Sequence, residues 1–328
     1  MQIEKPYWSP AVCAGFLLDW DGVLAETRLD FSGIREKYYG GRRAMLLEEA
    51  ETLPEGLRAE FFAELKELEM AGAEQATPVP GAFELIEWLD SHDVPYCILS
   101  RNCMDVIRRG AAAIGFELPE KTWGRDNFPW VKPDPRALNA AAAEMGAAPS
   151  SCIYIGDFLY DLQGARRAGM RAALVQRDTA EWDAWADVTY PTLEDLVAEL
   201  KEPKPLVPWE YREIFAKKGE RWLANAAQLC FALPDDTSPN ADCWLMRAAA
   251  LGVGSFRIDP ERRMTPEEWK KSASFAPAEM GELWFDVVSR FLASRFPMAE
   301  IVTEAEEVCA APKNSLDLMR FIERKKIK

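Results

Sequence analysis

The feature that most constrains the fold of this chain is residues 16–24, Phe-Leu-Leu-Asp-Trp-Asp-Gly-Val-Leu. An apolar run that leads directly into acidic residues is typical of a strand buried on both faces of a parallel sheet. Gly22 allows a sharp turn at the carboxyl end of that strand, where open α/β sheets place their ligands. Because Asp19 and Asp21 are two residues apart, extended backbone directs both side chains to the same side. The alternative is a strand that ends in an ordinary polar turn.

Three later stretches argue against that alternative. The carboxyl ends of parallel strands meet at one edge of the sheet, so polar residues that follow several strands converge there. Taken singly, each stretch has an ordinary explanation as a helix N-cap, a loop lysine or a turn residue. Taken together and in order, they predict one site. They are residues 96–99 followed by Ser100 and Arg101, Lys132 before a helix-opening segment, and residues 153–156 followed by Asp157 and Asp161.

An acid pair, a hydroxyl, a lysine and a second acid pair, in this order, resemble the motifs of the haloacid dehalogenase-like superfamily, and in particular its phosphatase branch. The resemblance covers roughly the first 200 residues and rests on four separate motifs. It implies a Rossmann-like parallel sheet with helices on both faces. It also implies that the insert at residues 25–76 is a small helical cap, as in phosphoglycolate phosphatase-like enzymes.

The resemblance implies a role for each motif residue. Asp19 matches the nucleophile that takes up the phosphoryl group as an aspartyl-phosphate, and Asp21 matches the general acid and base. Ser100 and the backbone amide of Arg101 match the groups that hold the phosphoryl oxygens. Lys132 matches the cation that binds phosphate and neutralises charge during transfer. The expected activity is hydrolysis of a small phosphate monoester.

The four acids also predict a metal site. Converging carboxylates repel one another, by about 4 kcal/mol at 4 Å with an effective dielectric near 20, so they must bind a cation or share protons. Oxygen ligands suit Mg²⁺. The resemblance implies that the carboxylates of Asp19 and Asp157 and the backbone carbonyl of Asp21 bind the metal directly. It implies that Asp161 either binds the metal directly or lies next to one of its ligands.

Asp21 bears on the reaction class. The dehalogenases that name the superfamily lack this second acid, because ester hydrolysis on carbon needs no protonation of the leaving group. Its presence therefore favours phosphoryl transfer. Two alternatives stay open: a phosphomutase on the same core, and a binding or regulatory protein whose C-terminal domain carries the function.

The remaining sequence predicts three parts. Alternating strands and helices over residues 77–202, together with residues 1–24, predict an α/β core with a parallel sheet. Residues 25–76 show apolar side chains at helical spacing, which predicts the cap helices. A proline-dense junction at residues 201–208 precedes residues 203–328, which we expect to form a mainly helical domain of unknown role. Its clearest predicted helices span residues 209–233, 277–296 and 316–327.

The charge distribution restricts the partners. The net charge of −15 comes entirely from residues 1–203, which hold 20 basic and 35 acidic side chains, whereas residues 204–328 hold 19 of each. This acidic surface disfavours the binding of nucleic acid, whose backbone is also negatively charged. No apolar run reaches membrane-spanning length, so we expect no membrane partner. The expected partner is a small phosphorylated metabolite, and a homo-oligomer or protein contact through residues 203–328 is left open.

The cysteine and histidine content excludes other chemistry. Seven scattered cysteines without a Cys-x-x-Cys pair argue against a disulfide framework and a structural zinc site. No signal-peptide core is found in residues 1–10, so we expect a reducing cytoplasm. His92 is the only histidine, which argues against catalysis by a Ser-His-Asp or Cys-His arrangement.

Overall fold

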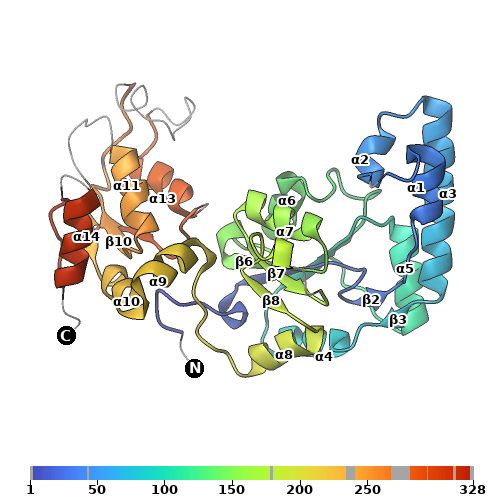
Figure 1. Cartoon of the computed structure of the whole chain (residues 1–328), viewed down its shortest axis with the longest axis horizontal. Helices are drawn as coiled ribbons and strands as arrows, with labels where there is room; N and C mark the ends of the chain where they lie inside the picture. Colours follow the sequence, from blue (N-terminus) through green and yellow to red (C-terminus); the bar gives the residue numbers. More distant parts are fainter. Residues whose placement is uncertain are drawn as a thin grey trace. The chain divides into compact units, whose positions relative to one another are not determined.

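The computed structural model of the chain describes residues 3–42, 44–177, 180–233, 241–266, 281–293, 295–312 and 315–325. Its contacts divide the chain into two compact units (Figure 1). The first unit, residues 13–201, contains the predicted α/β core and cap. The second combines residues 1–12 with residues 202–328. Residues 1–12 were predicted to belong to the α/β core, but Trp8 and Leu206 exchange backbone hydrogen bonds of 3.1 and 2.8 Å, which join them to the second unit.

The first unit is built on a six-stranded sheet with the order β5-β4-β1-β6-β7-β8, in which all neighbouring strands are parallel. The central strand β1 is buried along its whole length, as the apolar run predicted. Because β4 and β6 flank β1, the residues that follow these three strands lie at one edge of the sheet. The strands are β1 (Gly15–Leu18), β4 (Tyr96–Leu99), β5 (Thr122–Trp123), β6 (Cys152–Gly156), β7 (Arg171–Val175) and β8 (Val188–Tyr190).

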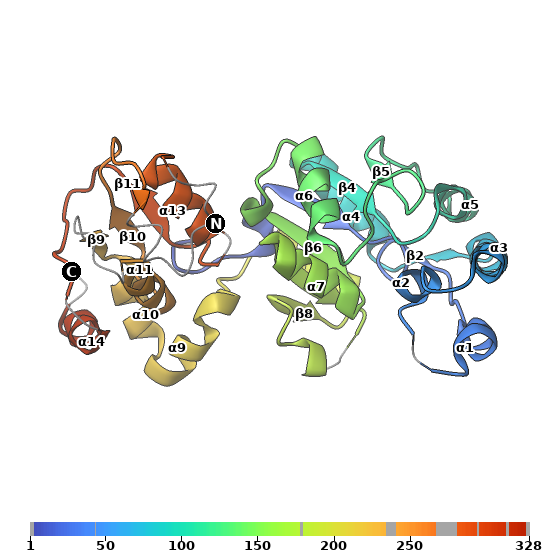
Figure 2. The ribbon, with the colours of Figure 1, turned by 90° about the horizontal axis from the view of Figure 1, so that it is seen from above.

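Helices cover both faces of this sheet (Figures 1 and 2). Leu17 of β1 belongs to a buried cluster that includes Leu138 of α6 and Leu162 of α7. The neighbouring Phe16 points to the other face, where its ring lies 6.2 Å from that of Trp88 in α4. This alternation is that of a strand between two helical layers. The helices are α4 (Ala82–Ser91), α5 (Met104–Ile114), α6 (Pro135–Glu144), α7 (Leu159–Ala168) and α8 (Leu193–Lys201).

The insert after β1 is helical and leaves the core through an antiparallel ribbon of β2 (Ala25–Glu26) and β3 (Thr77–Pro78). Its small core surrounds Phe61, whose ring lies edge-on to that of Tyr38 at 5.2 Å. The longest of its helices, α3, packs along α5 of the core (Figure 2). The insert therefore rests on the core through one long helix. Its helices are α1 (Ser32–Tyr39), α2 (Leu46–Ala50) and α3 (Glu55–Glu74).

The second unit contains helices, as expected, and also a three-stranded parallel sheet with the order β11-β10-β9 that the sequence did not suggest. The prediction of one helix over residues 209–233 is wrong in two places. Gly219 divides it into α9 and α10, and its last residues form the strand β9. Part of the predicted helix at residues 277–296 lies outside the described residues. The elements are α9 (Arg212–Lys218), α10 (Glu220–Ala227), β9 (Cys230–Ala232), α11 (Ala241–Ala250), β10 (Ser255–Arg257), α13 (Trp284–Ala293), β11 (Glu300–Val302) and α14 (Ser315–Arg324).

This unit has an apolar core of its own, which includes Trp222, Phe231, Phe256, Trp284 and Leu318. None of the helices in the described part of the chain is both long and apolar enough to cross a membrane.

Candidate active site

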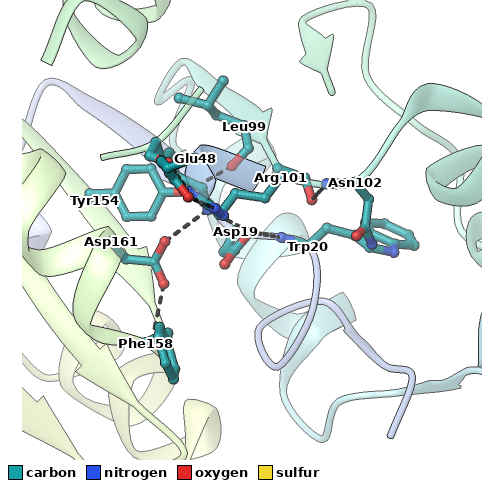
Figure 3. Close-up of polar contacts among 11 residues, drawn as sticks. Asp19, Trp20, Glu48, Leu99, Arg101, Asn102, Tyr154, Phe158 and Asp161 are labelled. Atoms are coloured by element: carbon teal, nitrogen blue, oxygen red, sulfur yellow. Dashed lines mark hydrogen bonds and ion pairs between the residues drawn. The ribbon is translucent and has the colours of Figure 1, made fainter. Parts of the chain in front are cut away.

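The carboxyl edge of the six-stranded sheet gathers the polar residues that the sequence predicted. Figure 3 shows three of them, Asp19, Arg101 and Asp161. Asp19 follows β1, Ser100 follows β4 and Asp157 follows β6. All three residues are buried, with at most 9% of their surface exposed. The amide of Asp19 donates to the carbonyl of Ile155, 3.0 Å away, so the end of β1 is fixed against β6.

Lys132 connects the two acid pairs. Its Nζ lies 2.7 Å from Asp19 Oδ1 and 2.8 Å from Asp161 Oδ1, and it donates to the Tyr154 hydroxyl at 2.6 Å. Burial alone would lower the pKa of Lys132, but the charges of Asp161 and Asp19 outweigh it and the pKa is raised. The ammonium is therefore kept charged while it is only 1% exposed.

Asp19, Asp157 and Asp161 each offer one carboxylate oxygen to a group in which these oxygens lie within 4.8 Å of one another. Burial, with the charge of Asp161 as the next cause, raises the pKa of Asp19 well above its usual value and that of Asp157 to about 6. A cation between these oxygens would reverse both shifts, because it stabilises the ionised carboxylates. An anionic, oxygen-only donor set of this size fits Mg²⁺.

Two glycines make this close approach of acids feasible. Gly22 has a φ of +74°, and a Cβ there would lie 2.3 Å from Asp157 Oδ2. A Cβ on Gly156 would lie 2.3 Å from Cβ of Asp161. No larger residue fits either position without moving an acid of the group.

Asp21 has different surroundings. Its two carboxylate oxygens accept hydrogen bonds from neutral donors, Thr27 Oγ1 at 2.6 Å and Asn102 Nδ2 at 2.5 Å. Burial raises the pKa of Asp21 to about 6, and the charge of Glu69 adds to the effect. Asp19 therefore lies in a group of charges that includes Lys132, whereas Asp21 is held by neutral hydrogen-bond donors, and burial raises the pKa of both.

The loop after β4 has two distinct side chains. Ser100 Oγ accepts from the amide of Asn102 at 3.1 Å, so its own hydroxyl hydrogen is available to a further acceptor. The guanidinium of Arg101 forms two hydrogen bonds with Glu48 of α2, at 2.8 and 2.9 Å, and lies 4.9 Å from the ring centroid of Tyr160. The side chain of Arg101 thus links the loop to the insert, which leaves only its backbone amide for the predicted phosphate contact.

A cavity of about 480 Å³ opens above these residues, between the sheet edge and the insert. We call Asp19, Asp21, Ser100, Asp157 and Asp161 the acid floor of this cavity. We call the insert side chains opposite them the cap wall. They are Leu29, Phe31, Arg35, Leu46, Leu47 and Leu65.

Comparison with known proteins agrees with this arrangement. Residues 13–169 match the family model of the haloacid dehalogenase-like hydrolases. These residues form a haloacid dehalogenase-like hydrolase domain. A solved structure of a hydrolase from Pseudomonas syringae superposes with a TM-score of 0.50 at 22% identity, over 58% of this chain and 99% of that one. This likeness supports the fold of the hydrolase domain.

Two curated relatives are phosphatases by name. Hexitol phosphatase A of Escherichia coli is 25% identical over 164 residues, which are 44% of this chain and 74% of that protein. N-acetylmuramic acid 6-phosphate phosphatase of Pseudomonas aeruginosa is 26% identical over 208 residues, which are 53% of this chain and 90% of that protein. Both matches cover most of the relative and about half of this chain.

The hydrolase domain also uses residues that the sequence did not single out. Tyr154 passes the hydrogen bond from Lys132 on to the carbonyl of Leu99, at 2.8 Å, and so fixes the lysine. A tyrosine within a fully buried strand is a signal that could have been used, because its hydroxyl needs a partner. Arg177 pairs with Asp157 at 2.8 Å, and no spacing in the sequence indicates this contact.

Proposed function

We propose that the hydrolase domain is a Mg²⁺-dependent phosphatase of small phosphate monoesters that works through an aspartyl-phosphate on Asp19. One observation carries the proposal: Asp19 and Asp21 face the same cavity in opposite surroundings. A nucleophile must be ionised, and the ammonium of Lys132 beside Asp19 favours the ionised form. A general acid must hold a proton, and burial raises the pKa of Asp21 to about 6. The phosphatase names of the two relatives support the same reaction class.

In the first step Asp19 attacks phosphorus. Its Oδ1 is bound by Lys132 and by the amide of Trp20 at 2.7 Å, while no donor among the described residues reaches Oδ2. A bond forms from Oδ2 to phosphorus, and the bond from phosphorus to the leaving oxygen breaks. Asp21 gives its proton to that oxygen, so the product leaves as a neutral alcohol.

In the second step Asp21, now a carboxylate, takes a proton from water. The oxygen of this water attacks phosphorus, the bond to Asp19 Oδ2 breaks, and phosphate is released. Thr27 and Asn102 hold the carboxyl group of Asp21 in one orientation through both steps. The same residue thus serves as acid and then as base.

The remaining residues stabilise charge on the phosphoryl oxygens. Lys132 is fixed by Tyr154 and supplies a buried positive charge beside Asp19. The free hydroxyl hydrogen of Ser100 and the amide of Arg101 are the proposed donors to the other oxygens. A bound Mg²⁺ would be held by Asp19, Asp157, Asp161 and the carbonyl of Asp21, and would supply positive charge to the phosphoryl group.

The test is phosphate release from p-nitrophenyl phosphate by the full chain. We expect turnover with Mg²⁺, none with excess EDTA, and recovery when Mg²⁺ is restored. A second readout is the melting temperature, which should rise with Mg²⁺ concentration in the wild type and less in Asp157→Asn, because a bound ion stabilises the folded state. Full activity in EDTA would contradict the proposed dependence on a metal. The absence of turnover under every condition would contradict the proposed phosphatase function.

A further inference from the structure

One cation of the cap wall, Arg35, lacks an ion-pair partner among the described residues. Arg35 lies on α1 and lines the cavity, and its Nε is buried without a hydrogen-bond partner. Its guanidinium lies 5.7 Å from the ring centroid of Phe31. Among the residues that the structure describes, no acid forms an ion pair with it.

Other arginines of the insert differ from Arg35 in this respect. Arg42 forms two hydrogen bonds with Glu49, and Arg58 pairs with Glu51 at 3.2 Å. Neither of them lines the cavity. Residues 1–203 hold 35 acids against 20 basic residues, so acidic partners are plentiful. An arginine that faces a cavity and has no acidic partner is available to an anion that enters from outside.

The charges around Arg35 favour such an anion. Arg28 also lines this side of the cavity and forms no side-chain ion pair among the described residues. Two acids of the insert also line the cavity. Glu26 accepts a hydrogen bond from the backbone amide of Arg28, and Glu69 pairs with Arg125 at 2.7 Å. Asp19 and Asp161 pair with Lys132 and Asp157 pairs with Arg177, whereas the two insert arginines that line the cavity form no ion pair among the described residues.

We propose that Arg35 binds a second anionic group of the substrate, so that the substrate is a phosphate monoester with a carboxylate or a further phosphate at its other end. This rests on the proposed function, because the acid floor must hold the scissile phosphate. A cavity of about 480 Å³ leaves room beyond one phosphate for a carbon skeleton. Leu46, Leu47 and Leu65 offer that skeleton an apolar surface. Arg35 is therefore a specificity-determining residue and takes no part in the bond-breaking steps.

The test uses a series of ω-phosphooxy carboxylates of two to six carbons, each with its uncharged ω-phosphooxy amide. Phosphate release by the full chain is measured with Mg²⁺, and p-nitrophenyl phosphate reports the basal activity. For the best chain length we expect kcat/KM to be about 10-fold to 100-fold higher for the acid than for the amide, as for one charge-assisted hydrogen bond. The difference should lie mainly in KM.

Three variants locate the effect. Arg35→Met should bring the acid-to-amide ratio close to 1 while the amide and p-nitrophenyl phosphate rates stay within about twofold of wild type. Arg35→Lys should restore part of the ratio. Arg42→Met, the matched control outside the cavity, should keep the wild-type ratio.

Two results would overturn the proposal: a wild-type ratio near 1 at every chain length, or an equal loss on acids and amides in Arg35→Met. The first needs no variant, so a folding defect in Arg35→Met cannot hide it. If p-nitrophenyl phosphate is hydrolysed and the ratio is 1, only this inference fails. If no phosphate monoester is hydrolysed, the proposed function fails and this inference with it.

Discussion

This chain contains two parallel sheets, and they differ in the residues at the carboxyl ends of their strands. In the six-stranded sheet, β1, β4 and β6 are followed by Asp19, Ser100 and Asp157. In the three-stranded sheet, β9 is followed by Leu233 and β10 by Ile258, and both side chains are buried. Both sheets bring strand ends together, but the first places polar groups after β1, β4 and β6, whereas the second places apolar side chains after two of its three strands.

The difference extends to the two units. Among the described residues of the second unit, the buried polar side chains are Ser9 and Asn225, whereas the first unit, residues 13–201, buries four aspartates, a glutamate, a lysine and an arginine. Buried charges destabilise a fold unless they are paired, so they persist where chemistry needs them. A parallel sheet thus offers a site, and the residues after its strands decide whether one exists.

The largest effect is expected at Asp19. Asp19→Asn should abolish turnover of p-nitrophenyl phosphate, because an amide cannot attack phosphorus, and should leave the fold intact or more stable, because it removes one of several crowded charges. Initial rates and thermal melts measure the two effects. The exposed Asp105→Asn is the control and should keep wild-type turnover. Wild-type rates in Asp19→Asn would rule out the covalent route.

Lys132 should come next. Lys132→Ala should lower kcat by about 10²-fold or more, comparable to the loss of one preorganised donor. It should also lower the melting temperature, because Asp19 and Asp161 lose their buried cation. The exposed Lys66→Ala, which loses only a surface pair with Asp105, is the control. A change in kcat below about twofold in Lys132→Ala would contradict the role of this lysine.

The smallest effect is expected from removal of the second unit. A protein of residues 13–201 keeps the acid floor and the insert. We expect its kcat on p-nitrophenyl phosphate to stay within about twofold of the full chain, because the polar strand ends all lie in this part. Circular dichroism checks that both proteins are folded. A folded but inactive protein of residues 13–201 would mean that the second unit contributes to catalysis.

Much of the hydrolase domain could be predicted because its signals are local. The buried strand at residues 16–18, the acids that follow it and Ser100 are each visible within a few residues. The helical insert was predicted from side-chain spacing, and its long helix begins directly after Pro54. Local patterns therefore located the sheet edge and its acid floor.

The rest depends on contacts between distant residues. The bond from Asn102 to Asp21 spans 81 residues, and that from Arg101 to Glu48 spans 53. No periodicity encodes such pairs. The strand β9 was missed because three residues after a helix are too few for the alternation that marks a strand. In the second unit β9 and β10 are followed directly by the apolar Leu233 and Ile258, so the sequence offered no motif at these strand ends.

The measurement that tests the account most directly is the leaving-group dependence of Asp21→Asn. The kcat/KM values of wild type and variant are compared on aryl phosphates of rising phenol pKa and on one alkyl phosphate. If Asp21 is the general acid, the loss should be smallest for the most acidic phenol and grow steadily toward the alkyl phosphate, because only poor leaving groups need the proton. A loss of the same size on every substrate would contradict the separate roles assigned to Asp19 and Asp21.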